Sequence, residues 1–130
     1  MGADVEERHW TSSIEGVPGA WLRVRFRTVD GVPTRFVVQL EFWEPVRVGD
    51  DIVVEQHQVA RFDHDASGDA YHDIREDGVH LDLYDRRGEK VRVARSGFPD
   101  WPPEVAIAKC QTFLVENAES LLEWFRDESP

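Results

Sequence analysis

The chain has 130 residues and a mass of 15.0 kDa, the size of one domain. Its 26 Asp and Glu residues outnumber its 15 Lys and Arg residues, so the net charge is −11. A surface this acidic repels nucleic acid and disfavours it as a partner. A single cysteine, Cys110, excludes an intramolecular disulfide framework.

No apolar run reaches the roughly 18 residues that would span a bilayer, and the acidic start of the chain lacks the regions of a signal peptide. We therefore expect a soluble cytoplasmic protein without membrane contact. The polar composition of residues 1–20 predicts a loose N-terminal arm. Residues 21–127 are expected to form a single α+β domain.

Residues 21–29 alternate between apolar side chains and arginines, and residues 33–43 alternate in a similar way. The Asp-Gly pair between them is a strong turn signal. If Phe26 faces Phe36, the apolar side chains of both strands share one face, whereas a slip of one residue would mismatch the faces. This register predicts a hairpin with a three-residue connection.

Residues 44–51 read as a turn, and residues 71–74 could form a short strand. The strand that follows the turn alternates imperfectly at Gln56 and Gln58, which indicates either a bulge or a part-polar pocket. Three further strands are predicted at 52–63, 79–84 and 91–93.

A helical pattern begins after the Pro-Pro pair that ends at Pro103. One apolar stripe is formed by Ile107, Cys110, Leu114, Ala118, Leu121 and Phe125. The stripe makes Cys110 a buried, inert thiol, and Asn117 could divide the helix in two. The predicted fold class is α+β, a five-stranded, mainly antiparallel meander sheet with a C-terminal helix on one face. The predicted core consists of Leu22, Val24, Phe26, Phe36, Val38, Leu40, Phe42, Leu81, Leu114, Leu121 and Phe125.

The densest group of polar residues lies between residues 61 and 82, and a first interpretation is a cation-binding loop. Alternate oxygen ligands on a tight turn suit a hard divalent cation such as calcium. The last position of such a loop holds Ile74, where a bidentate glutamate is needed. The candidate metal ligands are Asp63, Asp65, Ser67 and Asp69, with Gly68 at the turn.

A second interpretation uses the three histidines of this segment, His64, His72 and His80, as a transition-metal or acid–base site. A histidine with Arg61 could also cleave RNA without a metal, the histidine moving protons and the arginine stabilising phosphate charge. The candidate catalytic residues are Arg61, Asp63, His72 and His80. In a third interpretation these polar residues only cap turns and form surface ion pairs.

Four arginines form a further candidate surface, because Arg23, Arg25, Arg27 and Arg35 share one face of the first two predicted strands. They could bind phosphate or an acidic partner. Alternatively, Glu41 and Glu55 neutralise them across the strands.

The stretches F-V-V-Q-L-E-F (36–42), V-A-R-F-D-H-D (59–65), H-D (72–73), E-D-G-V-H-L-D-L-Y (76–84) and V-E-N-A-E-S-L-L (115–122) resemble a family of small archaeal and bacterial proteins of unknown function. The R-F-D motif followed by histidines is more loosely similar to the TumE-like toxins of toxin–antitoxin pairs. That resemblance implies an endoribonuclease that uses Arg61, Asp63, His72 and His80. The chain lacks the clustered histidines of those toxins and is more acidic than an RNA-directed toxin.

The expected function is that of a non-catalytic interaction or regulatory module with a protein partner or a second copy of the chain. Its acidic rim would meet a cationic partner or a divalent cation. The alternatives are a toxin-like endoribonuclease and a metal-binding loop protein.

Overall fold

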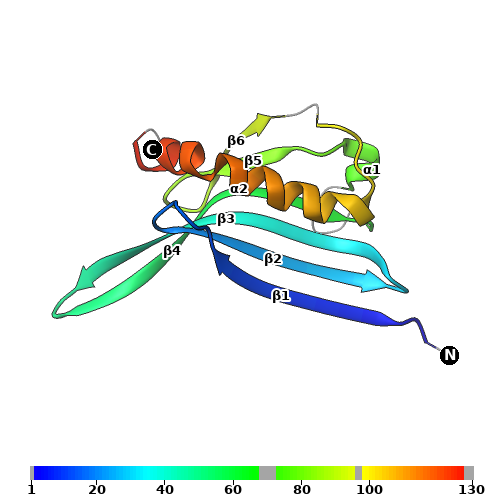
Figure 1. The fold of residues 1–130 in the computed structure, drawn as a ribbon, viewed down its shortest axis with the longest axis horizontal. Helices are drawn as coiled ribbons and strands as arrows, with labels where there is room; N and C mark the ends of the chain where they lie inside the picture. The colour runs from blue at the N-terminus through cyan, green and yellow to red at the C-terminus, as the bar shows by residue number, and fades with distance from the viewer. Residues whose placement is uncertain (1, 68–72, 96–97, 128–130) are drawn as a thin grey trace.

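The computed structural model describes residues 2–67, 73–95 and 98–127. The elements along these residues are β1 (Val5–Ser13), β2 (Ala20–Val29), β3 (Val32–Val48), β4 (Asp51–Asp65), α1 (Ile74–Asp77), β5 (Leu81–Tyr84), β6 (Lys90–Arg95) and α2 (Pro103–Asp127). The strands form one antiparallel sheet in the order β1-β2-β3-β4-β5-β6, and α2 lies across one face (Figure 1). The α+β class and the C-terminal helix are confirmed, but the sheet has six strands instead of five.

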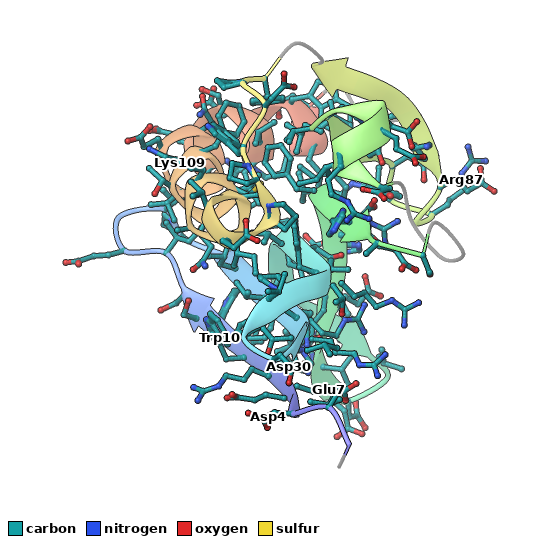
Figure 2. All side chains as sticks on the ribbon, turned by 90° about the vertical axis from the view of Figure 1, so that its right-hand side faces the viewer. Asp4, Glu7, Trp10, Asp30, Arg87 and Lys109 are labelled. Atoms are coloured by element: carbon teal, nitrogen blue, oxygen red, sulfur yellow. The ribbon has the colours of Figure 1, made fainter. Side chains whose placement is uncertain are left out.

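The additional strand is β1, which lies within the N-terminal segment, residues 1–20, that was expected to be loose. It pairs with β2 along its whole length. At its start, the backbone N–H of Asp4 donates to the Asp30 side chain at 2.9 Å, and the Asp30 N–H donates to the Asp4 carbonyl at 2.8 Å (Figure 2). Trp10 adds an edge-to-face contact with Phe26, with ring centroids 5.8 Å apart. Main-chain pairing, this aromatic contact and the contact of His9 Nε2 with Arg23 Nη1 at 3.0 Å therefore order the segment.

The β2–β3 hairpin has the predicted register, with Phe26 opposite Phe36. The register shifts by one residue near Thr28, and the loop is then only Asp30 and Gly31. Both loop residues have positive φ, 50° and 80°, as a two-residue turn that follows the strand twist requires. The expected three-residue connection was wrong, because the one extra residue of this hairpin lies in a β-bulge between the strands and not in the loop.

Residues 44–51 do not form the expected turn. β3 continues to Val48 and β4 begins at Asp51, so only two residues form the turn. The result is a two-stranded ribbon, residues 44–55, that projects beyond the rest of the sheet (Figure 1). We call this ribbon the arm.

A second bulge explains the imperfect alternation of β4. Leu40 pairs with Ala60, but its neighbour Glu41 pairs with Gln58, so Val59 is the extra residue. Beyond the bulge the even-numbered residues change face, and Gln56 lies on the side opposite to Ala60. Of the two alternatives, the bulge is therefore confirmed.

The expected short strand at 71–74 lies partly outside the described residues. Its last residue, Ile74, begins the one-turn helix α1 instead. The Asp73 side chain caps this helix by accepting the backbone N–H of Arg75 at 3.0 Å. The cap and the buried Ile74 side chain turn the chain back toward β5.

Helix α2 is continuous through Asn117, whose side-chain amide donates to the Phe113 carbonyl at 2.8 Å. The predicted core is buried except for Phe26 and Leu121, which are half-buried, and Leu122 is buried in place of Leu121. The buried line along the helix is Pro103, Ala106, Cys110, Leu114, Ala118, Leu122 and Phe125. Among the described residues no helix has the length and apolar character needed to cross a membrane.

Candidate functional site

The two faces of the sheet differ in chemistry. The inner face packs against α2 and carries the apolar core. The outer face, on the opposite side, carries the arginines of β2 together with Glu41, Arg61 and Asp63. At its centre the buried Glu41 carboxylate accepts from Arg23 Nε at 2.6 Å and from Trp43 Nε1 at 2.7 Å. Arg23 is therefore neutralised across the strands, as one of the two alternatives predicted.

Three of the four candidate catalytic residues lie close together near the β4–β5 pairing. Arg61 Nε donates to Asp63 Oδ2 at 3.1 Å on the outer face. Arg61 also pairs across the strands with Asp82, and His80 Nε2 lies 3.8 Å from Asp82 Oδ1. The fourth candidate, His72, lies outside the described residues. This group, Arg61, Asp63, His80 and Asp82, is called the outer-face cluster.

The structure adds Tyr84 to this region, a residue that the sequence analysis did not select. The Arg61 guanidinium lies over the Tyr84 ring, 5.1 Å from its centroid. Burial raises the pKa of Tyr84 to about 12, so its hydroxyl stays protonated at neutral pH. A signal was available, because Tyr84 follows Asp82 at the two-residue spacing that places side chains on one face of a strand.

His64 belongs to the core and not to the outer-face cluster. It is fully buried on the inner face, opposite Phe36 on β3, with the ring centroids 5.4 Å apart. The backbone N–H of Ile74 donates to His64 Nδ1 at 3.1 Å. His64 therefore packs with the core, whereas His80 lies beside Asp82, and His72 lies outside the described residues.

The candidate cation loop begins inside a strand. Asp63 and Asp65 belong to β4, where both point to the outer face, and the turn starts only at residue 66. Asp63 accepts from Arg61, and Asp65 Oδ1 accepts from the Ser67 N–H at 3.0 Å and from the Ser67 hydroxyl at 2.7 Å. Gly68 and Asp69 lie outside the described residues. The three described ligand candidates thus hydrogen-bond with protein groups.

Another group has the spacing of metal ligands. The ligand atoms of Glu44, Glu55 and His57 all lie within 4.8 Å of one another, at the base of the arm. His57 Nε2 is 2.9 Å from Glu44 Oε1 and 3.3 Å from Glu55 Oε2, and Arg86 Nη1 contacts the same Glu44 oxygen at 2.9 Å. Burial acts to raise the Glu44 pKa, but the hydrogen bonds from Arg86 and His57 outweigh it and lower the pKa. Arg86 and the His57 imidazole already contact this carboxylate.

A depression of about 420 Å³ lies between the first three strands, near the β2–β3 turn. The arginines Arg25, Arg27 and Arg35 line it, while Arg23 does not reach it. Arg27 lies 3.9 Å from Glu7 and Arg35 lies 3.6 Å from Asp65, whereas Arg8 Nε contacts Glu6 Oε1 at 2.6 Å. We call it the basic depression, and its lining residues are Glu7, Arg8, His9, Arg25, Phe26, Arg27, Arg35, Phe36 and Val37.

The arm carries apolar side chains into solvent on both of its faces. Val48, Ile52 and Val54 are 59%, 67% and 59% exposed. Ile52 and Val54 share one face of the ribbon, and Val53 pairs with Val46 on the other. The sequence analysis missed the arm because a proline, a glycine and several acids in residues 44–51 resemble a turn.

Comparison with known proteins adds the family. No curated protein and no solved structure matches the chain. A family model described as "Domain of unknown function (DUF7718)" matches residues 5–129. This match agrees with the expected membership of a family of unknown function, and it does not confirm the resemblance to TumE-like toxins. The chain belongs to the DUF7718 family.

Proposed function

We propose that this protein is a protein-interaction module that contacts its partner through the arm. The observation that carries the proposal is the exposure of Val48, Ile52, Val53 and Val54 on a ribbon that projects from the sheet. The hydrophobic core contains no residue of the arm. The fold therefore does not need these apolar side chains for its own packing.

Physical arguments support a binding role for the arm. A ribbon of two strands is marginally stable in water without a third strand or a covering helix. Large contiguous patches of exposed apolar side chains are rare on monomeric proteins, and where they occur they mark interaction sites. A partner that covers Ile52 and Val54 would remove apolar surface from water and also order the ribbon.

A photocrosslinking experiment tests the proposal. Benzoylphenylalanine in place of Ile52 should give an adduct of one defined mass in the native cells, and mass spectrometry then identifies the partner. The matched control places the same group at Val115, an exposed aliphatic position on α2. Binding of the purified partner should be lost in an Ile52→Ser/Val54→Ser variant and kept in Val115→Ser. Equal crosslinking at both positions would overturn the proposal.

The outer-face cluster supports a second candidate function, endoribonuclease activity. Its support is the proximity of Arg61, Asp63 and His80 near the β4–β5 pairing. Arginine could stabilise phosphate charge while histidine transfers a proton. On this proposal, His80→Ala and Arg61→Met abolish RNA cleavage by folded protein, and the exposed His9→Ala serves as the control. Unchanged cleavage in both variants would eliminate this candidate.

A further inference from the structure

We infer that the partner of the arm is a second copy of this chain, and that each arm docks in the basic depression of the other copy. This inference rests on the proposed function, since it names the partner of the same surface. It is carried by the opposite charges of two regions that lie far apart on one molecule.

The two regions have complementary composition. On the outer face, the lining of the basic depression carries three arginines, Arg25, Arg27 and Arg35, against the single glutamate Glu7. The arm carries four carboxylates against one arginine, with the acids Asp50 and Asp51 at its tip and exposed aliphatic side chains beside them. In a chain with a net charge of −11, a local excess of arginine is unusual. The two regions therefore match in charge, which favours their association and fixes its orientation.

The positions of the two regions allow a closed dimer. The depression lies near the start of β3 and the arm contains its end, so they occupy opposite ends of the sheet (Figure 1). About ten residues separate them along β3, on the order of 30 Å. A two-fold axis near the middle of the outer face would set two copies head to tail. Both arms would then meet a depression at once, which closes the assembly without leaving a free site.

The electrostatic part of this contact predicts its response to salt. Exposed charges are screened beyond about 8 Å at physiological ionic strength, so the dimer should weaken as salt is added. The apolar part, through Ile52 and Val54, is not screened. The dimer should therefore weaken with salt without being lost entirely.

A charge-swap experiment tests the inference by sedimentation velocity. The wild-type chain should form a dimer, whereas Asp50→Arg/Asp51→Arg and Arg25→Glu/Arg27→Glu should each be monomeric. When mixed, these two variants should form a 1:1 dimer, because both of its contacts then join opposite charges. The control is Glu116→Arg/Glu119→Arg on the exposed side of α2, which should stay dimeric. Circular dichroism confirms that each variant is folded.

The outcomes separate this inference from the proposed function. A monomeric wild type, or a mixture that does not associate, overturns the inference. A crosslink from position 52 to a different protein also overturns it but supports the proposed function. If Ile52→Ser/Val54→Ser dissociates the dimer and neither charge reversal does, the arm is the contact surface and the basic depression is not its docking site.

Discussion

Arg23 and Glu41 form a two-point ion pair across β2 and β3, in which both Nε and Nη2 of the arginine contact the carboxylate, at 2.6 and 3.3 Å. Glu41 is only 3% exposed, although it lies on the face opposite to the helix. The indole N–H of Trp43 donates to the same carboxylate, and the Trp43 ring stacks on Trp21 with centroids 3.9 Å apart. This carboxylate organises the centre of the outer face.

Replacing Glu41 should therefore destabilise the protein strongly. Glu41→Ala leaves the Arg23 guanidinium and the Trp43 N–H without their acceptor, and loss of one member of such a buried pair costs about 3 kcal/mol. Urea denaturation measures the change in the free energy of unfolding. The control is Glu7→Ala, an exposed acid 3.9 Å from Arg27, which should change stability by less than about 0.5 kcal/mol. Equal effects of the two variants would contradict the assigned role of Glu41.

How far the fold follows from the sequence depends on which elements face the core. The β2–β3 register was predictable because apolar residues such as Phe26 and Phe36 must share one buried face. β1 was not predictable, since eight of its nine side chains are exposed and backbone pairing leaves no trace in residue type. The arm escaped prediction for the same reason: both of its faces meet solvent, so nothing imposes an alternation on residues 44–55.

His64 should make stability depend on pH below about 6.5. Burial lowers the pKa of His64 from its ordinary value, and the Asp73 carboxylate, 3.7 Å from Nδ1, opposes this shift only in part. The folded protein then keeps the ring neutral while the unfolded chain takes up a proton. The free energy of unfolding should therefore be highest above pH 6.5 and fall as pH drops below that value, by at most about 1.4 kcal/mol per pH unit for this group.

Nuclear magnetic resonance checks this prediction at the residue itself. The His64 ring signals of the folded protein should titrate below 6.5, and the urea-unfolded chain supplies the reference. A His64→Gln variant should show a flatter dependence of unfolding free energy on pH between 7.5 and 5.5. A folded-state pKa of His64 at or above the unfolded value would show that burial does not control this ring.

The candidate site shows a limit of spacing arguments. Asp63, Asp65 and Ser67 recur every second residue, which is the ligand spacing of a cation loop and also the period of one face of a β-strand. The sequence offers no means to separate these readings before the extent of β4 is known. By contrast, the proximity of His80 to Asp82 follows from the same two-residue period once β5 is assigned.

Cys110 should be unreactive in the folded protein. Its side chain is fully buried on the side of α2 that packs against the sheet, and burial raises the pKa of the thiol to about 12. At pH 8 a chromogenic disulfide reagent should label it only as fast as the protein opens, and at full rate in urea. Cys110→Ser should cost about 1–2 kcal/mol, because the hydroxyl loses its water without gaining a partner. Rapid labelling of folded protein would contradict this placement of the helix.

Gly19 and Gly16 allow the strain of a backbone conformation to be separated from a steric clash. Both have positive φ, 81° and 82°. A Cβ added at Gly16 would meet nothing within 4 Å, whereas one added at Gly19 would lie 2.6 Å from Cε1 of Phe42. Gly16→Ala should therefore cost only the left-handed backbone penalty, about 1 kcal/mol.

Gly19→Ala carries the same backbone penalty and must also displace the Phe42 ring, which packs against Phe125 of α2 with centroids 6.2 Å apart. Overpacking of this kind adds about 1–3 kcal/mol, so the total loss should be roughly 2–4 kcal/mol in urea denaturation. The difference between the two variants measures the clash alone, because their φ angles match. The backbone N–H of Trp43 donates to the Gly19 carbonyl at 2.8 Å and holds this loop close to the core. Equal losses of stability in the two variants would show that the loop before β2 does not press on Phe42.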